Sequence, residues 1–424
     1  MAVSLETYEP TDPGVQQDPF PHYAALRDQA AVWQGSSGTF FVSRHDAVRE
    51  VLEQPNLFSS QWANTAGPPP IAKGDDEILA IYRNGYPPVN TMLTLDPPLQ
   101  TRYRKAVGPA FTPRRMQAME PRIRRIAIDL IEGLPRRGTV DFVRQMAVPY
   151  PVRVISHALS IPLALERDVK RWSDDSVAAI GVEISRERAL EAARGIVEMQ
   201  NTLAGLVASS RETPKDDILT AIVEAQFGDT DGTNRQLNVP EMLSILQQLM
   251  VAGNEATTKG ISEIVKLLVE HPDQWRRIQD DPGIIPAVVD EGLRLASPNQ
   301  GLFRVCTADA EVAGTKIPEG SMLWVMFGSA NRDERVFPDP DRFDPDRPNL
   351  NEAVTFGRGA HYCIGAPLAR LEIQVLLEEM AERIESLRFA KGCSLTYEPS
   401  FILRGLERLD LEIVRQSRAS GAGR

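Results

Sequence analysis

The amino-acid sequence predicts a fold that is mainly α-helical with a minor β part. From about residue 99 to 296, apolar side chains recur every three or four positions, the spacing that places them on one face of a helix. After residue 297, short apolar runs alternate with turn residues, which is typical of a small β-sheet. At roughly 150 residues per domain, a length of 424 residues would suggest about three domains, although this rule is only a prior.

The N-terminal part contains one expected hairpin and one expected helix. Residues 1–20 are polar and rich in Pro and Asp, and we expect residues 1–14 to form a flexible surface arm. Two short apolar runs, at 33–34 and 40–42, flank a Gly/Ser turn and predict a β-hairpin. Residues 45–54 are amphipathic and predict a helix. Residues 66–98 are broken by Gly and Pro, so they are expected to be a functional lid or a mobile stretch.

The central part is expected to be helical. The clearest periodic segments are 115–133, 188–209, 215–227, 240–270 and 284–296. Residues 229–232 predict a turn before the long segment, and Pro240 fits the first turn of that helix.

The C-terminal part changes character again. Short strands are expected near 312–314 and 322–326, followed by an irregular stretch rich in Asp, Arg and Pro at 331–350. Residues 368–387 predict a last helix, and 417–424 are expected to be a disordered tail.

The composition excludes several classes of function. A formal net charge of −11 argues against a general nucleic-acid binder and against docking on anionic lipid. Three scattered cysteines form no disulfide framework, which favours a reducing compartment. The N-terminus lacks the pattern of a signal peptide, and no apolar run approaches the ~20 residues that span a bilayer. We therefore expect a soluble cytoplasmic protein, without a membrane or nucleic-acid partner.

One stretch departs from the acidic average. Residues 101–125 contain a single acid, Glu120, against eight basic residues: Arg102, Arg104, Lys105, Arg114, Arg115, Arg122, Arg124 and Arg125. Two interpretations are open, a solvated helix face and a docking patch for an acidic partner.

The Gly-rich loop around Cys363 is the strongest candidate for chemistry. Glycines at 357, 359 and 365 let the backbone approach a flat ligand, and a helix begins just after the cysteine. The N-terminus of a helix favours the thiolate form of a nearby cysteine. Phe356 could cover one side of a metal site. Two alternatives are a structural cysteine in a turn and a zinc site shared with His361, but zinc needs four ligands, and the other cysteines have no ligand spacing.

This loop resembles the cysteine-ligand motif of the cytochrome P450 family, Phe-Gly-x-Gly-x-His-x-Cys-x-Gly, at all six fixed positions, Phe356 to Gly365. The resemblance extends from about residue 15 to 415. It implies one mostly helical cytochrome P450 domain over residues 1–424. It also implies haem b (iron protoporphyrin IX) bound between the helix at 240–270 and this loop, with Cys363 as the thiolate ligand.

A second motif is Glu291-Gly292-Leu293-Arg294. Residues at i and i+3 share a helix face, so Glu291 and Arg294 can form an ion pair. The motif resembles the Glu-x-x-Arg of the family, in which an arginine from the following meander completes a buried ion network. Arg347 fits that role best, and Arg342 is a rival.

A third motif lies in the helix at 240–270. Small residues at Ala252, Gly253 and Ala256 leave a notch in an apolar helix face, beside the acid Glu255. The resemblance implies that the notch lies over the haem, where O₂ reacts. The family has threonine where this chain has Ala256, and Thr257 is about 100° round the helix. The departure puts the usual proton-delivery route in doubt, and we expect Glu255 to supply protons through water.

Four side chains are expected at the haem propionates. Gln100 and Arg104 share one helix face after Asp96-Pro97-Pro98, a run that resembles another family motif. Arg304, six residues after Pro298, matches the propionate arginine of the family, and His361 is the fourth candidate.

The resemblance implies a monomeric haem-thiolate monooxygenase. It would insert one oxygen atom from O₂ into a small-to-medium apolar organic substrate, with electrons from an acidic iron–sulfur ferredoxin, or a flavodoxin, and its reductase. Two alternatives are a peroxide-driven or substrate-assisted oxygenase, suggested by Ala256, and a non-catalytic haem-binding sensor. By position against the family, the substrate pocket should include Leu93, Gln248, Val251, Ala252, Gln300, Leu302, Phe401 and Ile402.

Overall fold

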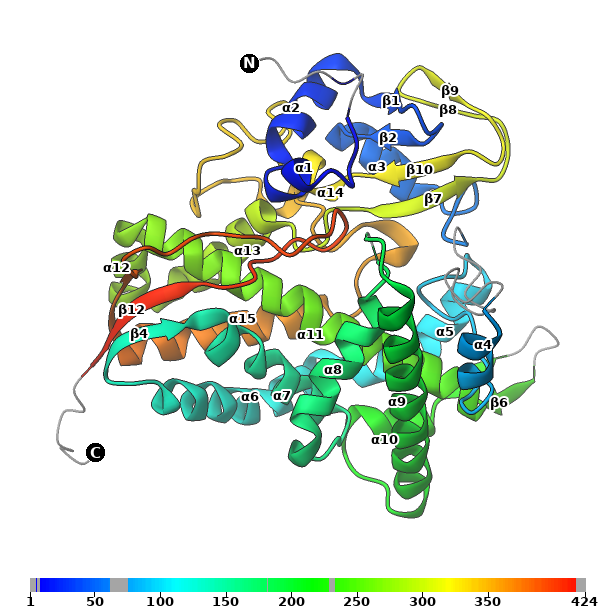
Figure 1. The fold of residues 1–424 in the computed structure, drawn as a ribbon, viewed down its shortest axis with the longest axis horizontal. Helices are drawn as coiled ribbons and strands as arrows, with labels where there is room; N and C mark the ends of the chain where they lie inside the picture. Colours follow the sequence, from blue (N-terminus) through cyan, green and yellow to red (C-terminus); the bar gives the residue numbers. More distant parts are fainter. Residues whose placement is uncertain (1–4, 6–7, 62–74, 181, 229–232, 417–424) are drawn as a thin grey trace.

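The computed structural model describes residues 5, 8–61, 75–180, 182–228 and 233–416. A β-rich part formed with the N-terminal helices lies against a larger helical part, and the long helix α11 runs through the latter (Figure 1). The expected turn at 229–232, the tail at 417–424 and part of the Pro-rich stretch at 66–98 lie outside the described residues.

Helices make up most of the described chain. They are α1 (Pro13–Gln17), α2 (Phe20–Gln29), α3 (His45–Glu53), α4 (Asp76–Tyr82), α5 (Leu99–Val107), α6 (Pro113–Gly133), α7 (Pro149–Ala158), α8 (Glu166–Val177), α9 (Arg186–Glu212), α10 (Ile218–Val223), α11 (Val239–Glu270), α12 (Pro272–Asp280), α13 (Ile285–Ala296), α14 (Phe327–Ala330) and α15 (Ala366–Arg383). The predicted long helix is therefore present as α11. It begins with a capping box between Asn238 and Glu241, which satisfies two backbone N–H groups at once.

The strands form one five-stranded sheet and three smaller ones. They are β1 (Val32–Gln34), β2 (Phe40–Val42), β3 (Phe58–Ser59), β4 (Arg137–Asp141), β5 (Gln226–Gly228), β6 (Asn234–Gln236), β7 (Leu302–Cys306), β8 (Ala310–Val312), β9 (Thr315–Ile317), β10 (Met322–Val325), β11 (Ile384–Phe389) and β12 (Asp410–Arg415). The large sheet has the order β1-β2-β10-β7-β3, in which β10 pairs in parallel with β2 and antiparallel with β7. It therefore joins the predicted N-terminal hairpin to the C-terminal strands.

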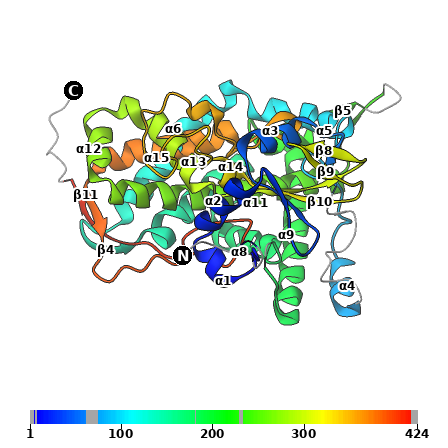
Figure 2. The ribbon, with the colours of Figure 1, turned by 90° about the horizontal axis from the view of Figure 1, so that it is seen from above.

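The main hydrophobic core surrounds α11. Helices α7, α8, α9, α13 and α15 all pack against it, and α6 packs on α15 at the far side. Seen from above, α11 crosses much of the length of the molecule (Figure 2). A helix covered on so many sides can carry polar groups only where they are paired or line a cavity.

Some sequence expectations need correction. The segment 215–227 is a short helix, capped by the side chain of Asp217, followed by a strand that pairs with β6. The predicted helix at 368–387 ends at Arg383, because residues from Ile384 pair with β12. The described part of the N-terminal arm is packed rather than free, since Tyr8 is buried against Phe41. Among the described helices, none combines the length and the apolar character needed to cross a membrane.

Candidate active site

A large, mainly apolar cavity lies between α11 and the loop that carries Cys363. Its empty volume, including the part open to solvent, is about 1450 Å³. One face of α11 forms a wall, contributed by Gln248, Leu249, Ala252, Gly253, Ala256 and Thr257. The i, i+4 spacing of Gln248, Ala252 and Ala256 explains why they face the same side.

The opposite wall is the Cys363 loop, and its shape depends on glycine. Gly357 and Gly359 have φ angles of +68° and +66°, a region that residues with a side chain rarely adopt. A Cβ on Gly359 would also lie 2.7 Å from the carbonyl oxygen of Leu52. The backbone N–H of Cys363 donates to the Phe356 carbonyl at 2.9 Å, which closes the loop just before α15.

The thiol of Cys363 faces the cavity but is otherwise surrounded by protein. Burial raises the pKa of Cys363, while the backbone N–H groups of Gly365 and Ala366 and the guanidiniums of Arg104 and Arg370 oppose that rise. The N-terminus of α15 thus lowers the pKa of Cys363 as expected, but burial raises that pKa by more. A metal bound to the sulfur would hold it as the thiolate.

Nothing in the described residues supports a zinc site. They contain no group of three or more His, Cys, Asp or Glu side chains that could hold a metal. Cys306 is buried in a separate hydrophobic cluster, and His361 Nε2 lies 3.0 Å from Ser60 Oγ.

Three nitrogen-bearing side chains, those of Arg104, Arg304 and His361, line the cavity beside this loop. None forms an ion pair with a carboxylate among the described residues. Arg104 donates to the Tyr362 carbonyl at 2.8 Å, and Arg304 to its neighbour, the Phe303 carbonyl, at 2.7 Å. Burial lowers the pKa of Arg304 to about 10. Burial, with Arg304 and Arg104 nearby, lowers the pKa of His361 to about 4.

Gln100 has a different position from the one expected. Its side chain is buried and donates to the Ala360 carbonyl at 2.7 Å, so it supports the Cys363 loop from outside the cavity. Phe356 and Gly365 do line the cavity. The guanidinium of Arg370 lies 4.4 Å from the ring centre of Phe356, which holds that ring in place.

The Glu-x-x-Arg motif forms a fully buried ion network. Arg294 donates to both carboxylate oxygens of Glu291, at 2.7 and 2.8 Å, and neither side chain is exposed. Arg347 completes it at 3.0 Å from Glu291. The rival Arg342 has a side chain that is 68% exposed and lies 3.9 Å from Asp344.

On α11, Ala256 and Thr257 both line the cavity, but Glu255 does not. Glu255 is buried beside the notch and pairs with Lys259 at 2.9 Å and Lys170 of α8 at 3.3 Å. Burial raises the pKa of Glu255, but the two lysines together bring it below its ordinary value. The expected acid is therefore an ionised group held against cations.

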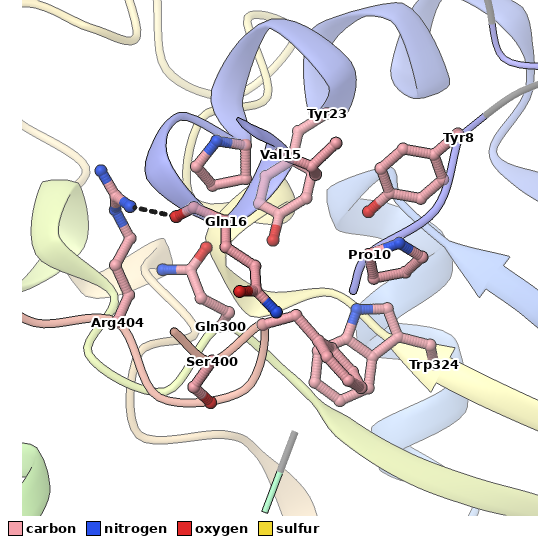
Figure 3. A pocket seen from close by; sticks show the side chains of 11 residues that line it. Tyr8, Pro10, Val15, Gln16, Tyr23, Gln300, Trp324, Ser400 and Arg404 are labelled. Atoms are coloured by element: carbon pink, nitrogen blue, oxygen red, sulfur yellow. Dashed lines mark hydrogen bonds between the residues drawn. The ribbon is translucent and has the colours of Figure 1, made fainter. Parts of the chain in front are cut away.

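Half of the expected substrate pocket lies on the cavity wall, namely Leu93, Gln248, Ala252 and Leu302. Val251 does not line the cavity and packs against the main core, because it lies on another face of α11. Phe401 and Ile402 belong to a hydrophobic cluster with Trp324 instead. Gln300 lines a separate small cavity beneath α1 and α2, near Arg404 and Tyr23 (Figure 3).

Sequence reasoning missed several wall residues, among them Met92, Ile155 and Glu372. Glu372 is 2% exposed, and its Oε2 has no hydrogen-bond partner among the described residues. Burial raises the pKa of Glu372 well above its ordinary value, so the carboxyl is neutral. Nothing in the local pattern indicates this, since a glutamate in the middle of a helix is usually solvated.

The residues present fit a haem bound through cysteine. The cavity offers one thiol, apolar walls, and two guanidiniums and an imidazole that pair with no carboxylate among the described residues, while a haem offers an iron, an apolar macrocycle and two propionates. Cys363 would hold the iron, and Arg104, Arg304 and His361 would hold the propionates. The fold and the cavity thus define a haem-thiolate protein.

Comparison with known proteins identifies the family. Residues 283–387 match the sequence model of the cytochrome P450 family. The vitamin D(3) 25-hydroxylase of Pseudonocardia autotrophica is 35% identical over 93% of this chain and 93% of its own length. The 6-deoxyerythronolide B hydroxylase of Saccharopolyspora erythraea is 35% identical over 92% of this chain and 95% of its own. The structure of cytochrome P450 CYP109Q5 from Chondromyces apiculatus matches with a TM-score of 0.83 and 34% identity, covering 97% of this chain and 99% of that one.

The chain belongs to the cytochrome P450 family. It is an oxidoreductase, a haem-thiolate monooxygenase that binds haem b and acts on an organic substrate with O₂ and a redox partner.

Proposed function

We propose that this enzyme inserts one atom of O₂ into a small-to-medium apolar substrate, using electrons from an acidic iron–sulfur ferredoxin. The observation that carries the proposal is the cavity, in which a cysteine thiol faces a notch of small residues in an apolar helix wall. When bound, a thiolate-ligated haem supplies the oxidising chemistry, because the thiolate favours O–O cleavage. The apolar walls exclude water and orient the substrate.

The substrate class is supported by the apolar lining of the cavity and by the relatives. The two hydroxylases named above act, by their names, on vitamin D₃ and on 6-deoxyerythronolide B. A molecule of this kind suits the apolar side chains of Met92, Leu93, Ile155 and Leu302.

We propose that protons reach the cavity through Glu255. Lys259 links Glu255 to Glu398 at 2.9 Å, and Lys170 links it to Asp174. The side chains of Glu398 and Asp174 are 44% and 45% exposed, so both reach solvent. Glu255 would first take up a proton that enters from solvent by way of Glu398 or Asp174, then leave its lysine partners, turn toward the cavity and pass that proton to a water held there.

Electron delivery is supported by the position of α5. Gln100 and Arg104 both bind carbonyls of the Cys363 loop, so this helix lies directly against the loop. Within the basic stretch, Lys105, Arg114 and Arg122 are exposed and form no ion pair with described residues. Three of the other arginines, Arg115, Arg124 and Arg125, are neutralised by nearby acids. Lys105, Arg114 and Arg122 therefore form the docking surface that we propose for an acidic partner.

Ala256 favours a second candidate, an oxygenase that is driven by peroxide or assisted by a hydroxyl of its substrate. Alanine cannot donate a hydrogen bond at the notch, whereas the neighbouring Thr257 lines the cavity and could.

The test measures product formed per NADH consumed with ferredoxin and its reductase, against product formed with peroxide alone. We expect efficient coupling, a loss of about 10²–10⁴ in rate for Glu255→Ala, and a mild effect of Ala256→Thr. Full rate and coupling in Glu255→Ala would transfer the proton role to the substrate or to Thr257. Poor coupling with brisk peroxide turnover would replace the ferredoxin-driven function by the peroxide-driven one.

A further inference from the structure

The amide of Gln248 is the feature of the cavity that the proposed chemistry leaves unexplained. Gln248 lies on the cavity face of α11, among apolar neighbours such as Leu249 and Leu93. Its Nε2 donates to Thr91 Oγ1 at 2.7 Å and to Ser244 Oγ at 3.2 Å. Its Oε1 is buried and has no hydrogen-bond partner among the described residues. Half of the amide is therefore satisfied and half is not.

The orientation of this amide is set by its neighbours. Ser244 donates its hydroxyl proton to the Val89 carbonyl at 2.6 Å, so Ser244 Oγ can act only as an acceptor toward Gln248. If the amide were flipped, Gln248 Oε1 would face Ser244 Oγ, and neither oxygen would have a proton to share, because Ser244 donates its own to Val89. Thr91 Oγ1 could donate to Oε1 in a flipped amide, but only the present orientation keeps both hydrogen bonds, so Nε2 faces Ser244 and Thr91, and Oε1 is the buried acceptor left without a donor.

A buried carbonyl without a donor is unfavourable, and a ligand that supplies the donor gains by removing that cost. We propose that Gln248 Oε1 accepts a hydrogen bond from a hydroxyl or N–H group of the substrate. The inference rests on the proposed oxidation of apolar substrates and narrows them to apolar molecules that carry one hydrogen-bond donor. Gln248 is then a specificity-determining residue.

The position of Gln248 along α11 predicts how far the hydrogen-bond donor of the substrate lies from the carbon that is oxidised. It precedes Ala252 by one turn and Ala256 by two turns, or about 6 and 12 Å along the helix axis. Because the notch formed by these alanines is the place where oxidation is proposed, the donor group binds away from the reacting carbon. The oxidised carbon should therefore lie roughly 6–12 Å from the donor. Substrate binding would also tie down the segment of Val89 and Thr91, which the same hydrogen bonds join to α11.

The test uses trios of compounds that share one skeleton and differ in one group, a hydrocarbon, a ketone and an alcohol. One trio is cyclohexylbenzene, 4-phenylcyclohexanone and trans-4-phenylcyclohexanol, and further trios extend to four-ring skeletons. Each compound is titrated into the haem-loaded enzyme, and the dissociation constant is read from the change in haem spin state. We expect each alcohol to bind about tenfold more tightly than its hydrocarbon and its ketone, from one added hydrogen bond.

Two variants assign the preference to the amide. In Gln248→Met, which has a similar shape and no amide, the alcohol and the hydrocarbon should bind equally. Gln247→Met is the matched control, because Gln247 bonds weakly to Ser176 at 3.4 Å and does not line the cavity, and it should behave like the wild type.

The outcomes separate this inference from the proposed function. Equal binding within every trio, or tighter binding of the ketones, overturns the role of Gln248 Oε1. Products oxidised next to the hydroxyl, identified by mass spectrometry and NMR, overturn the distance argument. Absence of any spin-state change, across all skeletons, would instead count against an apolar organic substrate.

Discussion

The buried network of Glu291, Arg294 and Arg347 and the cluster of Arg104, Arg304 and His361 each contain two arginines, yet they differ in how the charge is balanced. In the first, a carboxylate accepts from both arginines, and backbone carbonyls of Asn331 and Pro340 take further N–H groups of Arg294. In the second, no carboxylate among the described residues pairs with any of the three. One cluster is complete within the chain, and the other is not.

This difference separates a structural role from a binding role. Removing a charge from water is costly unless partners replace the lost hydration. The Glu291 network provides those partners and can be buried permanently. Arg304 lacks them, and burial lowers its pKa to about 10, a sign that the charge is poorly supported. Its missing partner is an anion, which the haem propionates would supply.

The largest effect is expected in the complete network. Arg294→Leu would leave Glu291 buried with only Arg347, and losing one partner of a buried pair costs about 3–5 kcal/mol. Urea unfolding, followed by circular dichroism, should show that the free energy of unfolding falls by that amount. Arg342→Leu is the matched control, because the exposed Arg342 should change the free energy of unfolding by less than about 0.5 kcal/mol. Equal effects of the two substitutions would remove the distinction between them.

Sequence reasoning succeeded where local spacing determines the contact. Glu291 and Arg294 share one helix face at i and i+3, and Ala252 and Ala256 share another at i and i+4, so their positions follow from helix geometry. The glycines of the Cys363 loop were also meaningful in sequence, because two of them adopt positive φ angles. The class of fold likewise follows from periodicity and turn residues.

The sequence could not fix contacts that depend on how distant segments pack. Glu255 was expected at the cavity, but Lys170, 85 positions earlier, holds it on another side of α11. Phe401 was expected in the pocket, but its ring lies edge-on against Trp324 in a separate cluster. Neither partner shares a local pattern with the residue that it holds.

A smaller effect is expected in the incomplete cluster. Arg304→Leu removes a cation that we place against a propionate, and such a charge-assisted hydrogen bond contributes about 1.5–3 kcal/mol. Transfer of haem to apomyoglobin should therefore be faster, by roughly 10- to 150-fold. The haem-free protein should unfold at the same or a higher urea concentration, since an uncompensated buried charge has been removed.

Arg358 provides the matched control for Arg304. It also lines the cavity, but Glu53 neutralises it at 2.9 Å. Arg358→Leu should leave haem retention close to that of the wild type. A structure with bound haem in which Arg304 lies far from both propionates would contradict the assignment, as would equal haem loss in the two variants.

The smallest effect tests whether missing carboxylates carry the same meaning at the surface. Lys105, Arg114 and Arg122 also lack ion-pair partners, but water solvates an exposed cation, so its isolation is weaker evidence for a partner than burial would be. Replacing all three with Glu should slow reduction of the haem by ferredoxin about tenfold at low ionic strength, through loss of electrostatic steering. The rate should also depend less on salt, and the spin-state titration of a bound alcohol should not change. The control replaces Arg83, Lys316 and Lys391 with Glu, which alters the net charge by the same amount at exposed positions on other elements. If that control slows reduction equally, the overall charge of the protein, and not this surface, attracts the donor. The absence of a carboxylate partner would then indicate a binding role only for buried cations.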